Sequence, residues 1–215
     1  TSGGDNATVG HGLGVAPEYI ITKNEDANSD WNVYGKGSQF SMGDNDVLNL
    51  NNSDAKGTSG SNAFIRDVSS TTFTLGNSTL VSNSGDNFIS YCFSSIPGYS
   101  KVGSYTGVDN DDGVFVYTGF RTNWVLIKCT THGEHWNIPA FTSRENPAKS
   151  NTSASVKTLS PNLNNAERDM DDNPCIQFHS NGFKILTNDG NYNRGGGTFL
   201  YLAFGEAPFK FARSR

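Results

Sequence analysis

The feature that most constrains the fold is a set of short segments that recur about 105 to 111 residues apart. "PEYIITK" at 17–23 aligns with "TNWVLIK" at 122–128, at a shift of 105. "DNFISYCF" at 86–93 aligns with "GTFLYLAF" at 197–204, at a shift of 111. Repeats of this kind decide the architecture, because each copy folds as a similar unit. The sequence therefore predicts an internal duplication, with halves at 1–100 and 101–215.

Further matches occur in the same order along both halves. Gly14 aligns with Gly119 and Trp31 with Trp136 at the shift of 105. "TTFTL", which starts at Thr71, aligns with "NGFKI" at a shift of 110. The shift grows only in the middle of the unit, as expected if a loop gained residues while the strands stayed constant.

Both halves consist of short apolar or alternating runs separated by clusters of Gly, Asn, Asp and Ser, a pattern typical of β-strands. "FISYCF" and "WVLIK" are nearly continuous, which predicts central strands covered on both faces. The segment 164–172 could form one or two helical turns at most. The fold class is predicted as all-β, with two tandem β-sandwich-like halves or one larger pseudo-symmetric sandwich.

Composition excludes several classes of partner. Charged residues are 17% of the chain and the net charge is −5, so no basic face for nucleic acid is expected. No apolar run approaches the roughly 18 residues that a membrane-spanning helix needs, so no membrane insertion is expected. A surface rich in Asn, Gly and aromatic residues suits neutral polyols. The three cysteines, Cys92, Cys129 and Cys175, are expected to be buried free thiols.

The stretches "DWNVY" and "HWNIP" contain the repeated tryptophans and allow two interpretations. In the first, Trp31 and Trp136 pack in the core or against a hairpin. In the second, each indole is exposed and a sugar ring stacks on it. The candidate ligand-binding residues in these stretches are Trp31, Asn32, Tyr34, Trp136 and Asn137.

The polar loops beside these stretches, "NEDANSDW" and "TTHGEHW", are the expected places for a ligand. A third loop, "TNDGNYNRGGG" at 187–197, adds Tyr192 and Arg194 to the ligand-binding candidates. Its counterpart "SNSGDN" at 82–87 is shorter and has neither residue. The alternative for the third loop is a glycine-rich hairpin without a ligand.

No pattern in the sequence argues for catalysis or for a required cofactor. "VDNDDGV" at 108–114 makes Asp109, Asp111 and Asp112 weak candidates for calcium, but it lacks the full ligand order and the distal Glu. Solvated turns are the alternative. Hydrolysis of a polysaccharide would need two carboxyl groups facing each other across a cleft, and most acids here lie in turns. The chain is therefore expected not to be an enzyme.

One passage, "GYSKVGSYTGVDNDDGVFVYTGFRTNWVLIK" at 98–128, resembles a duplicated domain family found in marine bacteriophages. "ATVGHGLGVAPEYIITK", "SNGFKI", "GGGTFLYLAF" and "APFKFARSR" extend the resemblance over essentially the whole chain. The family occurs near the C-terminal end of tail-fibre and other virion structural proteins, which would make Arg215 a natural end. The chain departs from it at 138–150, where Pro139 aligns with Tyr34 and predicts an edge strand or a turn.

The resemblance implies a β-rich virion appendage that is assembled in the bacterial host cytoplasm and forms a homotrimer. The first expected function is attachment to a glycan or surface protein of the host, strengthened by avidity. The second is a structural one, as a capsid-decoration or spacer domain that packs against other virion subunits. A polysaccharide depolymerase is the third and weakest alternative.

Overall fold

The computed structural model describes residues 7–35, 40–43, 45–58, 64–139, 157–169 and 175–205. Strands dominate this part of the chain, and its one α-helix, α1, spans only Gly190–Asn193. The prediction of an all-β protein is confirmed. The described residues of 164–172 contain a short strand, β14 (Arg168–Asp169), and no helix.

The chain divides into two compact units. Unit 1 comprises Thr1–Ser94 with Thr130–Gly133, and unit 2 comprises Ser95–Cys129 with Glu134–Arg215. The division at Ser94 lies close to the predicted boundary at residue 100, but the loop Thr130–Gly133 is grouped with unit 1.

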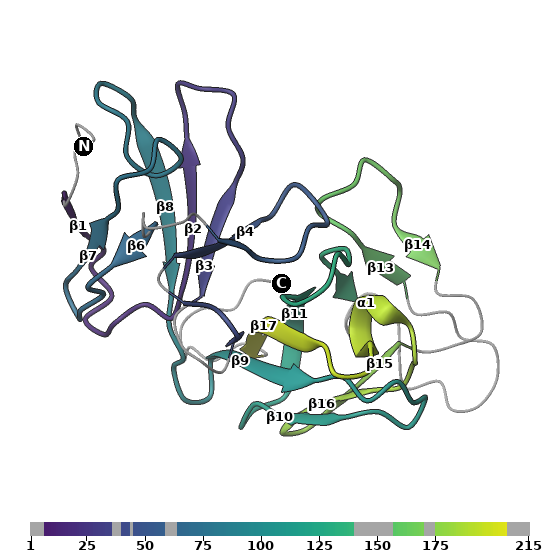
Figure 1. The fold of residues 1–215 in the computed structure, drawn as a ribbon. Helices are drawn as coiled ribbons and strands as arrows, with labels where there is room; N and C mark the ends of the chain where they lie inside the picture. The colour runs from purple at the N-terminus through teal and green to yellow at the C-terminus, as the bar shows by residue number, and fades with distance from the viewer. Residues whose placement is uncertain are drawn as a thin grey trace. The chain divides into compact units, whose positions relative to one another are not determined.

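Unit 1 is a β-sandwich of two antiparallel sheets. Its core lies between them and includes Ile20 and Tyr34 from one sheet and Ile65, Phe73 and Leu75 from the other. The five-stranded sheet has the order β5 (Gly57–Thr58), β4 (Asp46–Asn49), β3 (Asn32–Gly35), β2 (Tyr19–Asn24), β8 (Phe88–Phe93) (Figure 1). The three-stranded sheet has the order β1 (Thr8–Gly10), β7 (Thr72–Leu75), β6 (Ile65–Arg66).

Unit 2 has three three-stranded sheets, of which the first two share one main core. The first has the order β11 (Thr122–Cys129), β17 (Thr198–Gly205), β9 (Ser100–Thr106). The second has the order β10 (Phe115–Tyr117), β16 (Gly182–Ile185), β15 (Ile176–His179). The third has the order β12 (Ile138–Pro139), β13 (Lys157–Leu159), β14. The strand that contains Pro139 therefore has only two residues and lies at a sheet edge, as its proline predicts.

Aromatic rings fill the space between the first two sheets of unit 2. The ring of Tyr105 stacks on that of Phe199, with centroids 4.9 Å apart and planes 4° apart. The ring of Phe183 meets Tyr201 edge-on at 5.5 Å and Tyr105 edge-on at 6.5 Å. All four side chains are buried. Such pairs stabilise a core beyond the area that they bury.

The pairing of β2 with β8 has the same register as the pairing of β11 with β17. Tyr19 lies opposite Phe93 in unit 1, and their counterparts Trp124 and Phe204 lie opposite each other in unit 2. Val9 lies opposite Phe73 and Val116 opposite Phe183, but Val9 and Val116 are 107 residues apart, so this pairing departs by two residues from the shift of 105 at Gly14 and Gly119. The pairing of β2 with β8 and of β11 with β17 follows the shifts of 105 and 111 found in the sequence, and the internal duplication itself stays a prediction.

The two counterpart strands "FISYCF" and "FLYLAF" differ in burial. Phe199–Ala203 of β17 are all buried, whereas no residue of β8 is. The prediction that "FISYCF" is a central strand covered on both faces is wrong. The reason is position, since β17 lies between β11 and β9 whereas β8 ends its sheet.

The core of unit 2 predicts a coupling between Gly103 and Tyr201. A Cβ at Gly103 would lie 2.4 Å from the Tyr201 hydroxyl oxygen, so Gly103→Ala should lower the free energy of unfolding by about 1–3 kcal/mol through overpacking. In a Tyr201→Ser background the same change should cost much less. Urea denaturation of the four proteins in this cycle measures the coupling. Equal costs of Gly103→Ala in both backgrounds would contradict it.

Candidate functional site

The repeated Trp-Asn pairs form the same hydrogen-bonded clamp in both units. In unit 1 the buried Asn32 amide donates to the backbone oxygens of Asp30 and Leu80, each at 3.1 Å. In unit 2 the buried Asn137 amide donates to the counterpart oxygens of His135 and Asn191, at 2.8 and 3.4 Å.

The tryptophan backbone completes each clamp. Trp31 N donates to Asn51 Oδ1 at 2.9 Å, and Trp136 N donates to Asn162 Oδ1 at 3.1 Å. Asn51 and Asn162 are themselves separated by the shift of 111. The motif recurs because each unit uses it to tie a strand start to two loops, which is a structural role.

The two indoles differ in exposure. Trp136 is 1% exposed and offers no face to a ligand. Trp31 is partly exposed and stacks on Tyr91, with centroids 6.5 Å apart and planes 27° apart. Of the two interpretations of the repeated tryptophans, core packing describes Trp136, and Trp31 keeps part of its ring at the surface.

The other predicted ligand-binding residues are mostly buried. Tyr34 is a core residue of unit 1, and Tyr192 is fully buried in unit 2. Burial raises the pKa of Tyr192 well above its usual value, and its hydroxyl bonds to Thr158 Oγ1 at 2.5 Å. Arg194 is half-exposed, but its guanidinium pairs with Glu134 at 2.6 Å. The structure thus joins the loops of Arg194 and Glu134 through this ion pair.

The three aspartates of the loop 108–114 have separate partners. Asp111 Oδ1 accepts from the backbone nitrogen of Asn188 at 3.0 Å, and Asp112 forms an ion pair with Lys184. Asp109 has a φ of 53°, and its backbone nitrogen donates to Asn193 O at 2.9 Å. Across the part of the chain that the structure describes, no group of three or more His, Cys, Asp or Glu residues could hold a metal ion. The calcium hypothesis gains no support from these contacts.

The loop "NEDANSDW" lines a polar cleft of about 520 Å³ in unit 1. The acidic side chain of Asp86, which lines this cleft, is already paired with amides. It accepts hydrogen bonds from Asn24 at 2.7 Å and from Asn83 at 2.8 Å. These bonds, led by that from Asn83, lower the pKa of Asp86. None of the described lining residues is aromatic, so the cleft offers no ring for stacking. The described lining is Asn24, Ala27, Asn28, Ser29, Asp30, Asn51, Thr79, Leu80, Asn83 and Asp86.

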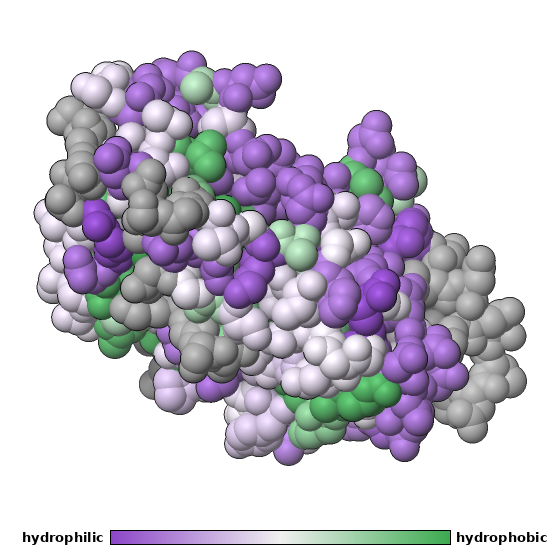
Figure 2. Space-filling model, in the orientation of Figure 1, coloured by the Kyte–Doolittle hydropathy of each residue, from purple (hydrophilic) through white to green (hydrophobic). Residues whose placement is uncertain are grey.

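Unit 2 has an exposed aromatic strand that the sequence analysis missed. Phe115 and Tyr117 are 46% and 65% exposed, whereas Val116 between them is buried. The alternation in "FVY" is the signal that could have identified them, because it places both rings on the wet face of the sheet. Figure 2 shows a mostly polar face with a hydrophobic area over the place of β10 and β16.

Two residues of the same sheet lie beside this aromatic face. Gly182 lies opposite Tyr117, and a Cβ there would lie 3.1 Å from the Phe115 ring and 2.1 Å from Val116 O. His179 meets the Phe115 ring edge-on at 5.5 Å. The strand β10 can therefore present the Phe115 and Tyr117 rings on one face, because the neighbouring strand β16 has a glycine opposite Tyr117.

A groove of about 330 Å³ lies beside Tyr117 within unit 2. One wall is the turn Ile96–Tyr99, in which Tyr99 N donates to Ile96 O at 2.9 Å. Pro97 and Gly98, with φ 75°, occupy the central positions that a type II turn favours. The groove is lined by Ser95, Pro97, Gly98, Ser100, Lys101, Tyr117, Thr118 and Gly119. We refer to this groove together with the Phe115 and Tyr117 rings as the aromatic groove.

The aromatic groove combines a ring face and a cation with hydroxyl groups that already bond within the protein: Ser95 Oγ bonds to Val102, and Thr118 Oγ1 donates to Phe120 O at 2.7 Å. No carboxylate within the described ranges pairs with Lys101, so its ammonium can donate to a ligand. Sugar rings bind through apolar C–H faces on aromatic rings and through hydroxyl hydrogen bonds at the rim. The arrangement can therefore bind a polyol, and none of its described lining residues is a carboxylic acid for hydrolysis.

Comparison with known proteins places the chain in a family. A family model described as a domain of unknown function, DUF7483, matches residues 1–208, so the chain belongs to this family. No curated protein and no solved structure matches the chain. No helix in the described ranges has the length and apolar character needed to cross a membrane.

The clamp predicts that Asn137→Ala destabilises the protein without a ligand being involved. Removing the buried amide leaves two backbone oxygens with one partner fewer, which should lower the free energy of unfolding by about 1–3 kcal/mol. Asn32→Ala should have a similar effect, and the exposed Asn165→Ala should change it by less than about 0.5 kcal/mol. Urea denaturation followed by circular dichroism measures all three. A clamp variant as stable as Asn165→Ala would show that the amides contribute nothing.

Proposed function

We propose that this chain is a non-enzymatic virion appendage domain that binds a glycan on a bacterial surface through the aromatic groove. The observation that carries the proposal is the pair of exposed rings, Phe115 and Tyr117, beside a groove with hydroxyls and Lys101. The resemblance to marine bacteriophage tail-fibre and virion proteins supplies the host-attachment setting.

Charge favours a glycan over nucleic acid as the ligand. The chain has a net charge of −5, and a phosphate backbone would be repelled by it. Within the aromatic groove Lys101 is a single cation among neutral hydroxyls and rings. Such a mixture suits hydrogen bonds to sugar hydroxyls and one contact to an acidic sugar substituent.

A single groove of this size binds weakly, so attachment would depend on several copies. A homotrimer, as the resemblance implies, would present three aromatic grooves. Linked sites raise the effective affinity without any new contact, provided that they reach the surface together. Binding should accordingly be measured on the chain displayed in multiple copies as well as free.

The second candidate function is structural. An exposed hydrophobic strand face such as that of Phe115 and Tyr117 also suits packing against another virion subunit, because exposed apolar patches mark interaction sites. In that case the same rings would be covered by protein in the particle and would have no affinity for sugars.

The test is binding of the chain, free and displayed in multiple copies, to glycan arrays and to intact marine bacteria. Tyr117→Ala and Phe115→Ala should each weaken binding roughly threefold to tenfold, since stacking contributes about 0.5–1.5 kcal/mol. Lys101→Gln should weaken binding to acidic glycans only.

The matched control is Tyr91→Ala, which removes an exposed aromatic ring from unit 1. It should bind like the wild type if the aromatic groove is the site. Binding that survives both Tyr117→Ala and Phe115→Ala in folded proteins would move the site elsewhere. No binding to any glycan or cell by the multivalent protein would favour the structural function.

A further inference from the structure

The strand β8 presents a backbone edge that no described residue pairs with. It is the last strand of its sheet, and it pairs with β2 alone. Glu25 N donates to Asn87 O at 2.9 Å, so these two residues form a hydrogen-bonded pair of the antiparallel ladder. Hydrogen-bonded and non-hydrogen-bonded pairs alternate along such a ladder, which makes the next pair, Asn24 and Phe88, a non-hydrogen-bonded one. The N–H and C=O groups of Phe88, Ser90 and Cys92 therefore point away from β2, toward the open edge.

The sequence of β8 does not protect this edge. Natural edge strands avoid unwanted pairing by means of charged residues, proline or bulges. β8 reads "FISYCF" and contains none of these residues, although every one of its side chains is at least partly exposed. An uncharged apolar edge of six residues is suited to pairing with an added strand.

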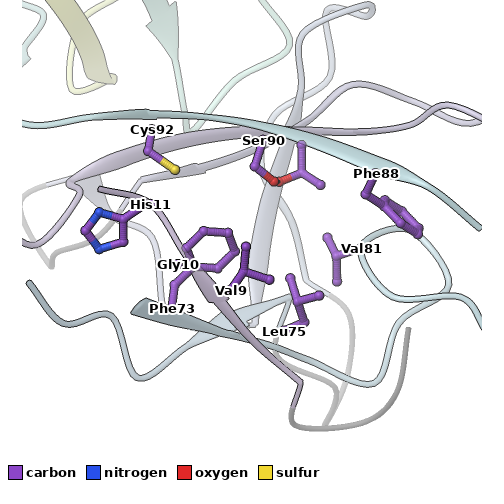
Figure 3. Close-up of a pocket in the computed structure, with 10 residues that line it drawn as sticks. Val9, Gly10, His11, Phe73, Leu75, Val81, Phe88, Ser90 and Cys92 are labelled. Atoms are coloured by element: carbon purple, nitrogen blue, oxygen red, sulfur yellow. The ribbon is translucent and has the colours of Figure 1, made fainter. Parts of the chain in front are cut away.

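Behind this edge lies a cavity between the two sheets of unit 1. Its volume is about 290 Å³, whereas an apolar cavity of about 150 Å³ already holds a benzene ring. Figure 3 shows Phe88, Ser90 and Cys92 of β8 on one side and Val9, Phe73 and Leu75 on the other. The remaining lining residues are Gly10, His11, Thr22 and Val81.

Unit 2 shows what occupies the corresponding space. There β9 pairs antiparallel with β17, the counterpart of β8, with Gly103 opposite Tyr201 and Tyr105 opposite Phe199. The Tyr105 ring enters the core and stacks on Phe199.

The same positions in unit 1 carry smaller or uncovered side chains. Phe199 corresponds to Phe88, and Tyr201 corresponds to Ser90. Phe183, on which the tyrosines of unit 2 pack, corresponds to Phe73 at the base of the cavity. Among the residues of unit 1 that the structure describes, neither the rings nor the strand that fill this space in unit 2 are present.

We propose that the β8 edge and the cavity behind it bind an extended segment of a partner polypeptide, which pairs antiparallel with β8 and inserts one aromatic ring against Phe88. The segment has the pattern of β9, with a glycine opposite Ser90 and the aromatic residue two positions later. A second β8 strand does not meet this requirement, because its inward side chains line its own cavity. The inference is independent of glycan binding by the aromatic groove.

The probe is a synthetic peptide with the sequence of residues 99–107, "YSKVGSYTG", added to the whole chain. It should bind saturably in calorimetry and slow amide hydrogen exchange in 88–93. The same peptide with Tyr105→Ala should bind at least tenfold more weakly, because it keeps the backbone pairing but lacks the ring.

Variants of the chain test whether the peptide binds at β8 and the cavity behind it. Ser90→Tyr, which puts the residue of unit 2 into the cavity, should weaken binding at least tenfold, and so should Phe88→Ala. Tyr91→Ala is the matched control because Tyr91 belongs to the same strand but does not line the cavity, and its binding should stay within twofold of the wild type. Circular dichroism checks that each variant is folded.

Three results would overturn the proposal. One is no binding of the peptide at millimolar concentration by the folded chain. Another is equal binding of the Tyr and Ala peptides, or protection outside β8. The third is a concentration-dependent dimer that protects 88–93 without any peptide, which would show that a second copy covers the edge.

Discussion

Filling the space between two sheets is the constraint on which the rest of this structure depends. Each unit must cover one buried face of each sheet, and only 34% of the chain is hydrophobic. Unit 2 meets the requirement with large rings: Phe183 is enclosed by Tyr105 and Tyr201, and Tyr105 lies flat on Phe199. Phe73 of unit 1 has the corresponding place but lines a cavity instead. The pairing of β2 with β8 thus has the register of β11 with β17, but the two units differ in how completely the sandwich is filled.

Asparagine contributes to this fold in a way that its abundance alone does not reveal. The clamps of Asn32 and Asn137 use a buried amide to satisfy backbone oxygens that would otherwise lack partners. Asn193 acts similarly: its amide donates to Asn110 O at 2.7 Å and to Thr187 O at 2.8 Å, and its oxygen accepts from Val108 N at 2.8 Å. Polar residues that suggest a sugar-binding surface in the sequence are therefore partly internal cross-links between loops.

The ligand-binding hypothesis moves as a result from the repeated tryptophan stretches to a different strand. Five of the seven candidate residues are buried, because they belong to the clamps and cores, and Arg194 is paired with Glu134. The hypothesis now rests on the exposed rings of Phe115 and Tyr117, whose positions in the strand pairing are taken in unit 1 by Thr8 and Gly10. A difference between the halves again marks the place where function is proposed. Here unit 2 carries exposed rings where the described strand of unit 1 has none, whereas at β8 the described residues of unit 1 lack the buried rings of unit 2.

The sequence by itself determined the all-β class, and it predicted a correspondence between the halves. Apolar runs and turn residues are local signals, and a repeated order of such signals is visible without a structure. It also predicted the free cysteines, of which Cys129 and Cys175 are buried and Cys92 is half-buried.

Only the tertiary structure decided which of two similar segments is covered and which is an edge. "FISYCF" and "FLYLAF" look alike in sequence, but β17 has a neighbour on each side and β8 has one. In the same way, burial separates Trp136 from Trp31, and the partners of Asn32 and Asn137 lie up to 54 residues away along the chain. Exposure depends on what packs against a residue from distant parts of the chain, and no local pattern contains that information.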